Sequence, residues 1–121
     1  MEYISAEEFL KQPVEVQNVF LEWWKPSEGD LFTNDILGGF GVITQDKLFK
    51  NGLIPLLTEG QLRNFIEHKI NKKVDIIHYI NEGYILVVDE DIDYSNLGHD
   101  LLQAYWKVAI EIASKEVIAN E

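Results

Sequence analysis

Carboxylates are the most abundant chemically active side chains in this sequence, and they gather loosely in two places. The two groups are Asp89, Asp91 and Asp93, and Glu28, Asp30 and Asp35. Paired carboxylates can act as general acid and base, but Asp89 and Asp91 alternate at a strand end, which favours a solvated sheet edge. At phosphate-like spacing, carboxylates would instead mimic nucleic acid and attract a basic partner. Two solvated turns are the simpler interpretation, because charge blocks commonly mark exposed segments.

The three histidines, His68, His78 and His99, lack the spacing of a metal site. None stands in an H-x-x-x-H or H-x-H pair, and a metal site needs three or four converging ligands. We expect His99 in the first turn of the last helix, where Asp100 complements the helix dipole. The sequence therefore predicts no metal site and no cofactor.

Nucleophilic catalysis has no support either. The chain has no cysteine, which excludes a thiol nucleophile, a zinc-thiolate site and a disulfide. A catalytic serine needs a neighbouring base and an oxyanion hole, whereas the four serines occupy expected caps, loops or helix surface. The Gly-Gly-Phe-Gly run at residues 38–41 lacks the Lys-Ser/Thr of a phosphate loop and favours a bent strand. We expect no catalytic residue and a non-enzymatic protein.

Aromatic side chains are the other candidates for a site. Trp23 and Trp24 diverge by about 100° on a helix and cannot both point to the same spot, but a wide core face could take both. Core packing is the simpler interpretation. The alternative is that one tryptophan lines a pocket or an interface. Arg63 could hold an anionic ligand, although Glu59 and Glu67 lie one turn away as ion-pair partners. The candidate pocket consists of Trp23, Trp24, Arg63, Tyr105 and Trp106.

Composition limits the partners. The formal net charge is −11, from 21 acids against 10 bases. This disfavours direct binding to nucleic-acid phosphates and to anionic membranes, and it suits a protein partner with a basic surface.

No apolar stretch approaches the roughly 20 residues of a membrane span, and the N-terminus lacks the pattern of a signal peptide. We therefore expect a cytoplasmic protein, and the oligomeric state stays open, with a homo-oligomer among the options.

The elements that must position these residues follow from hydrophobic periodicity. Capping boxes at Ser5 and Thr58 begin two helices, and Pro13 ends the first helix or opens the next. Strands are expected at residues 31–33 and 36–44, and a hairpin at 74–80 and 84–88 around a glycine-containing loop. Ser95 or Asn96 is the expected cap of the last helix. The sequence predicts one α+β domain over residues 1–121, with helices covering one face of a small antiparallel sheet. The predicted order is helix, helix, strand, strand, helix, strand, strand, helix.

Four stretches carry a resemblance to known proteins: YISAEEFL at residues 3–10, FLEWWKP at 20–26, IPLLTEGQLR at 54–63 and LLQAYWKVA at 101–109. Through them the chain resembles a group of small uncharacterised proteins of phages and prophages of Gram-positive anaerobes. The resemblance implies a phage context but no transferable activity. Phage accessory genes often encode compact acidic proteins that block host defence by binding, which is an argument by analogy.

Charge, missing catalytic residues and this resemblance together give one functional hypothesis. The chain is expected to be a phage-encoded accessory protein that binds and inhibits a host defence protein, with nucleic-acid mimicry as one mechanism. One alternative is a small-ligand-binding protein that sequesters a nucleotide signal in an aromatic pocket. An undetected enzyme and a phage structural component are further alternatives.

Overall fold

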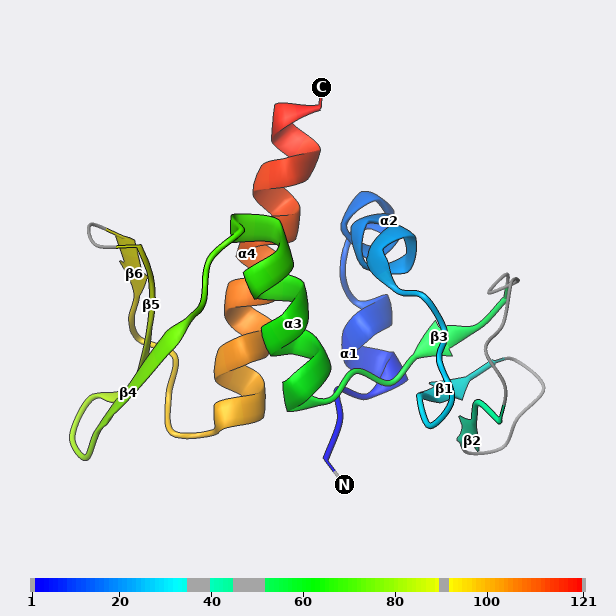
Figure 1. Cartoon of the computed structure of the whole chain (residues 1–121), viewed down its shortest axis with the longest axis horizontal. Helices are drawn as coiled ribbons and strands as arrows, with labels where there is room; N and C mark the ends of the chain where they lie inside the picture. The colour runs from blue at the N-terminus through cyan, green and yellow to red at the C-terminus, as the bar shows by residue number, and fades with distance from the viewer. Residues whose placement is uncertain (1, 35–39, 45–51, 90–91, 121) are drawn as a thin grey trace. The chain divides into compact units, whose positions relative to one another are not determined.

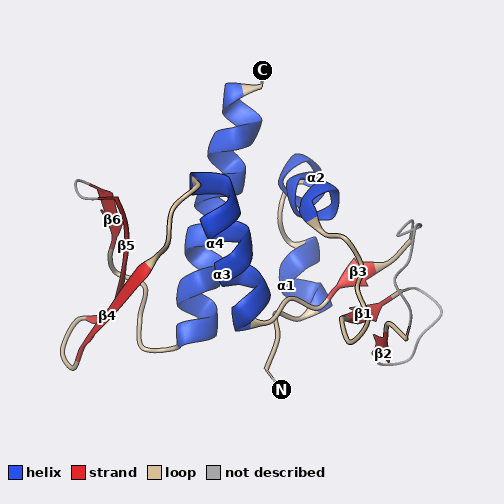
Figure 2. Cartoon of the chain, viewed as in Figure 1, coloured by secondary structure: helices blue, strands red, loops and turns tan. Residues whose placement is uncertain are grey.

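The computed structural model describes residues 2–34, 40–44, 52–89 and 92–120. Its helices and strands form an α+β structure, which confirms the predicted class and order of elements (Figures 1 and 2). The chain divides into two units, each with its own internal contacts. Unit 1 comprises Met1–Tyr3 and Thr58–Glu121, and unit 2 comprises Ile4–Leu57. The prediction of one domain over the whole chain stays a prediction.

Unit 2 begins with two short helices, α1 (Ala6–Leu10) and α2 (Val14–Trp23). The Ser5 hydroxyl caps α1 by accepting a hydrogen bond from the Glu8 N–H at 3.1 Å. Pro13 precedes the first residue of α2, where a missing N–H costs nothing. Val16, Val19 and Phe20 of α2 are buried, and the rings of Phe9 and Phe20 meet edge to face with centroids 6.2 Å apart.

The strands of unit 2 are β1 (Leu31–Thr33), β2 (Gly41–Val42) and β3 (Ile54–Pro55). They form an antiparallel sheet in the order β2-β1-β3. The strand expected at residues 36–44 is observed only as β2, and residues 35–39 of that region lie outside the described part of the chain, including two of its three glycines. The sequence did not predict β3, a two-residue strand.

The helices of unit 1 are α3 (Glu59–Ile70) and α4 (Leu101–Ala119). The predicted capping box of α3 is confirmed, with Thr58 and Gln61 bonded reciprocally. The predicted cap of α4 is wrong, because Asp100 is the cap and accepts from the Gln103 N–H at 2.9 Å. Asn96 and Gly98 have positive φ angles, so the chain turns there and the helix cannot begin earlier. His99 therefore precedes α4 and does not lie in its first turn.

The second sheet consists of β4 (Asp75–Tyr79), β5 (Gly83–Asp89) and β6 (Ile92–Tyr94) in the order β4-β5-β6. All of its pairings are antiparallel, and the predicted hairpin is confirmed. One face of the sheet packs on α4, with Leu86 fully buried and Lys115 of α4 donating to the Tyr94 hydroxyl at 3.2 Å. The sequence predicts one sheet, whereas the described residues form two sheets of three strands each.

Candidate functional site

The face of the β4-β5-β6 sheet that turns away from α4 is the candidate site. Directly paired residues of neighbouring antiparallel strands share a face, and here Asp75 pairs with Val87, which pairs with Asp93. The next row of the same face pairs Ile77 with Ile85. Together with Tyr79, which lies two residues further along β4, these residues define the outer face: Asp75, Ile77, Tyr79, Ile85, Val87 and Asp93.

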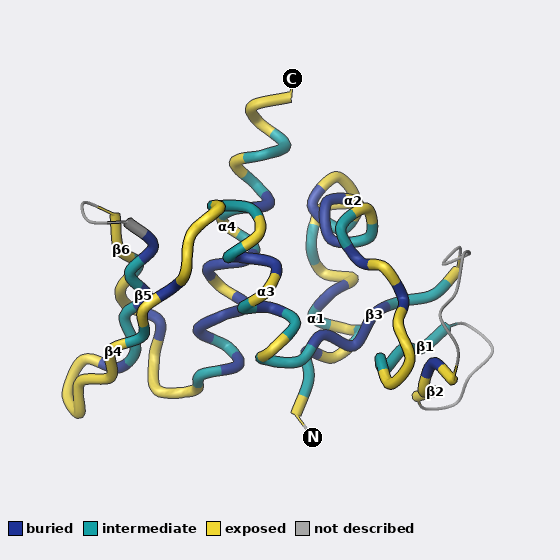
Figure 3. The backbone as a smooth tube through the Cα atoms, in the orientation of Figure 1, coloured by how far each residue is buried: buried dark blue, intermediate teal, exposed yellow. Residues whose placement is uncertain are grey.

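The outer face exposes two large apolar side chains to solvent. Ile77 is 41 % exposed and Tyr79 is 49 % exposed, and most of β4 is yellow in Figure 3. Ile85 and Val87 beside them are half-buried, whereas Leu86, which points the other way, is fully buried. The sheet therefore has one packed face and one open face, as antiparallel sheets often do.

Two carboxylates border this apolar centre. Asp75 and Asp93 are both exposed and lie on either side of Val87 in one row of the sheet. Two strand spacings separate them by roughly 10 Å. A surface that contacts Val87, Ile77 and Tyr79 would therefore meet negative charge at two edges. Such an arrangement suits apolar groups flanked by lysine or arginine.

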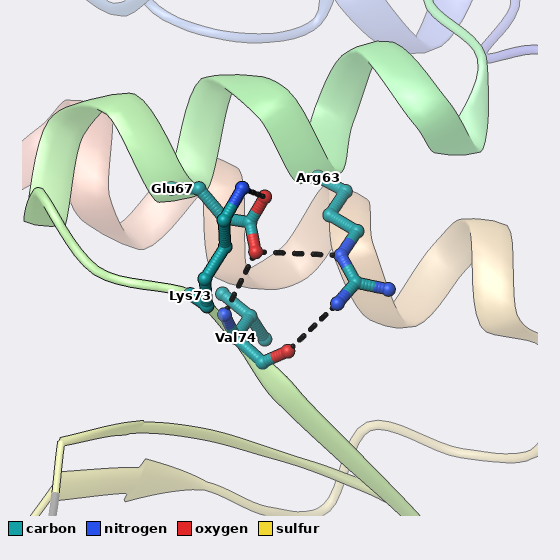
Figure 4. A network of polar contacts seen from close by, with 4 residues as sticks. All are labelled: Arg63, Glu67, Lys73 and Val74. Atoms are coloured by element: carbon teal, nitrogen blue, oxygen red, sulfur yellow. Dashed lines mark hydrogen bonds and ion pairs between the residues drawn. The ribbon is translucent and has the colours of Figure 1, made fainter.

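A polar network fixes the start of β4 and with it the position of Asp75 (Figure 4). Glu67 Oε2 accepts hydrogen bonds from the Val74 N–H at 2.9 Å and from Arg63 Nε at 3.4 Å. A terminal guanidinium nitrogen of Arg63 also donates to the Val74 carbonyl oxygen at 3.0 Å, and Lys73 Nζ lies 3.7 Å from Glu67 Oε1. The hydrogen bond from Val74 lowers the pKa of Glu67, and the two cations act in the same direction, against the effect of burial.

The loop that joins β4 to β5 is fixed by contact with the segment before α4. Gly83 has a φ of +86°, a conformation that favours glycine, and it forms an isolated parallel bridge with Gly98. The Tyr84 N–H donates to the Gly98 carbonyl oxygen at 2.8 Å. The backbone therefore ties the hairpin to the entrance of α4.

The residues expected to line an aromatic pocket are divided between the two units. Trp24 is 2 % exposed and donates from Nε1 to Asp30 Oδ2 at 3.0 Å, while Trp23 is half-buried. Both tryptophans belong to unit 2. Tyr105 and Trp106 are buried in unit 1, and burial raises the pKa of Tyr105 while Arg63 beside it acts to lower it.

The predicted acidic groups belong to different units. In unit 2, Asp30 accepts from Trp24 Nε1 and from the Ser27 N–H, both at 3.0 Å, so it organises its own loop. Glu28 is exposed, and Asp35 lies outside the described residues. In unit 1, Asp89 ends β5 and pairs with Ile92. Asp93 belongs to the outer face, and Asp91 also lies outside the described residues.

A surface hollow of about 430 Å³ lies at the end of α3. Its lining residues are Asn64, Glu67, His68, Asn71, Lys72 and Lys73. Two lysines could attract an anion, but the carbonyl end of a helix dipole repels one, and Glu67 adds a negative charge. The hollow therefore offers little support to a nucleotide-binding function.

Sequence reasoning predicted the hairpin but missed the outer face. The run from Val74 to Ile80 is apolar at most positions on both faces, so alternation could not tell which face α4 would cover. The signal available was Asp75, a charge on an expected strand, whereas Asp93 lay beyond the expected strands because the sequence did not predict β6. A charge on a strand indicates the solvent-facing side.

Comparison with known proteins adds no relative: no family model, curated protein or solved structure matches the chain. In the parts of the chain that the structure describes, no helix has both the length and the apolar character to cross a bilayer.

Proposed function

We propose that this chain is a binding protein without enzymatic activity, and that its outer face binds a partner protein with a basic, partly apolar surface. The observation that carries the proposal is the row Asp75–Val87–Asp93 beside exposed Ile77 and Tyr79. The row combines apolar contact area with two carboxylates on one side of a sheet. This row therefore supports the expectation of a basic partner, which follows from the net charge.

The energetics favour such a contact. Covering an exposed isoleucine or tyrosine removes apolar area from water at about 25 cal/mol per Å², and tyrosine is enriched among the residues that dominate protein interfaces. Asp75 and Asp93 would select lysine or arginine at the rim, where charge sets specificity and association rate. The net charge of −11 would attract a basic partner over a longer range.

The resemblance to phage and prophage proteins supports a partner in the host cell. We propose that binding covers a functional surface of a host defence protein and so inhibits it. Nucleic-acid mimicry is the form of this proposal in which carboxylates dominate. It requires Asp89, Asp91 and Asp93 to contribute more to binding than the apolar centre of the outer face does.

Photo-crosslinking identifies what covers the outer face. A photoreactive residue at position 77 should capture the partner in cells that contain the protein, whereas one at Glu111, exposed on α4, should not. The captured partner is then purified and titrated with variants. Ile77→Asp should weaken binding at least about tenfold, equivalent to 1.4 kcal/mol. Ile80→Asp is the matched control, because Ile80 is 87 % exposed in the hairpin loop and lies outside the outer face.

Charge reversal separates the two forms of the proposal. Asp75→Lys combined with Asp93→Lys should weaken binding and reduce its dependence on salt. If mimicry operates, reversal of Asp89, Asp91 and Asp93 together should cost more affinity than Ile77→Asp, and nucleic acid should displace the protein from its partner. Equal binding by the Ile77→Asp and Ile80→Asp variants, or no capture specific to position 77, would overturn the proposed interface.

A further inference from the structure

His78 and His99 lie 21 positions apart in the sequence, but the fold brings their imidazoles together. His78 Nε2 and His99 Nδ1 are 3.1 Å apart, and the two rings are nearly perpendicular with centroids 5.3 Å apart. Both side chains are exposed. His78 lies on the face of β4 opposite to Ile77 and Tyr79, so this pair is separate from the outer face.

Backbone pairing fixes the two histidines in place. His78 pairs with Tyr84 in the β4–β5 ladder, and the Tyr84 N–H donates to the carbonyl oxygen of Gly98, the residue before His99. The Tyr84 ring lies 4.4 Å from the His78 ring. The two imidazoles therefore come from backbone segments that main-chain hydrogen bonds hold next to each other.

We propose that His78 and His99 form a binding site for a divalent transition metal such as Zn²⁺. Metal–nitrogen bonds of 2.0–2.1 Å place two ligand nitrogens about 2.9 Å apart at a right angle and about 3.3 Å apart at a tetrahedral angle. The observed 3.1 Å lies between these values. Imidazole suits Zn²⁺, Ni²⁺ and Cu²⁺, and the net charge of −11 favours cations near the surface.

The site differs from a structural zinc site in being open. The pair supplies two ligands, fewer than the three or four protein ligands of catalytic and structural zinc sites. No third histidine, cysteine or carboxylate joins it within the described residues, so water would occupy the remaining coordination positions. Without metal, one imidazole donates a hydrogen bond to the other. With metal, both nitrogens present lone pairs, and the donor's proton moves to its other ring nitrogen.

Titration calorimetry of the untagged protein with ZnCl₂ tests the site. We expect one zinc ion per chain near neutral pH, and at least about tenfold weaker binding for His78→Gln and for His99→Gln, or 1.4 kcal/mol. His68→Gln is the matched control, because His68 is an exposed histidine on α3. Paramagnetic Ni²⁺ should broaden the NMR ring signals of His78 and His99 and leave those of His68 sharp.

Three results would overturn the site: no zinc binding at neutral pH, equal affinity of the wild type and both pair variants, or an equal loss in the His68→Gln variant. In the first two cases the pair is a hydrogen bond only, and in the third the zinc is bound non-specifically. Circular dichroism of each variant verifies that the fold is retained, which exposed His→Gln changes should permit.

Discussion

At the scale of single residues, Glu67 joins α3 to the start of β4 through its carboxylate. Its carboxylate accepts from the Val74 N–H and from Arg63, with Lys73 close by. The side chain is only 12 % exposed, so its contacts are better shielded from solvent than those of a surface ion pair. Arg63, a candidate for holding an anionic ligand, bonds to Glu67 and to the Val74 carbonyl oxygen.

Replacing Glu67 by glutamine should destabilise the protein by about 1–2 kcal/mol at neutral pH, because hydrogen bonds to a charged group lose their ionic component. The pKa of Glu67 is lowered in the folded state. The carboxylate's contribution is therefore complete above the unfolded value of about 4.3 and is lost as the pH falls through the lower folded value. Urea denaturation at several pH values should show the difference between wild type and variant shrinking in acid.

The control for this change is Glu7→Gln on α1. Glu7 pairs with Lys11 at 3.7 Å with the same spacing of four residues, but its side chain is 82 % exposed. Exposed pairs contribute little, so this variant should follow the wild type across the pH range. A Glu67→Gln difference that stays constant or grows on acidification would contradict the proposed ionic role.

At the scale of elements, the contact between Gly83 and Gly98 joins the hairpin to the entrance of α4. A Cβ at position 83 would overlap the Gly98 carbonyl oxygen, whereas a Cβ at Gly29 would meet nothing within 4 Å. Both glycines have positive φ angles, +86° and +94°. Alanine substitutions at these two positions therefore separate the cost of backbone strain from the cost of steric overlap.

Gly29→Ala should cost about 1 kcal/mol, the usual penalty of a left-handed alanine. Gly83→Ala should cost clearly more, because the backbone of one segment must also move. Thermal unfolding followed by circular dichroism measures both variants, and failure of Gly83→Ala to fold agrees with the expectation. Equal costs for the two variants would show that the bridge between the hairpin and the α4 entrance adds nothing to stability.

At the scale of the whole molecule, the question is whether the two units unfold together. Unit 2, Ile4–Leu57, has fewer than the roughly 60 residues at which a domain becomes marginal by itself. The length of 121 residues also fits a single domain. We therefore expect one cooperative transition.

The tryptophans make this testable, because Trp106 belongs to unit 1 and the other two to unit 2. In a Trp106→Phe variant, fluorescence reports unit 2 alone, while far-ultraviolet circular dichroism is dominated by the long helices α3 and α4 of unit 1. Urea transitions from the two signals should coincide. Two separate midpoints would show that the units unfold as two independent domains.

The sequence by itself determined the local elements, because their signals lie within a few residues of each other. The capping box at Thr58, the proline that opens α2 and the glycine-containing hairpin all have short-range physical causes. The cap of α4 was misassigned among several polar residues, since only the turn at Asn96 and Gly98 excludes an earlier start.

Only the tertiary structure decided which face of each element is covered. The run from Val74 to Ile80 is apolar on both faces, and the packing of α4 on one of them leaves Ile77 and Tyr79 in water. The contact of His78 with His99 and the hydrogen bond from Arg63 to Val74 also join residues that are far apart in the sequence. These contacts depend on long-range packing, which no local pattern of residues encodes.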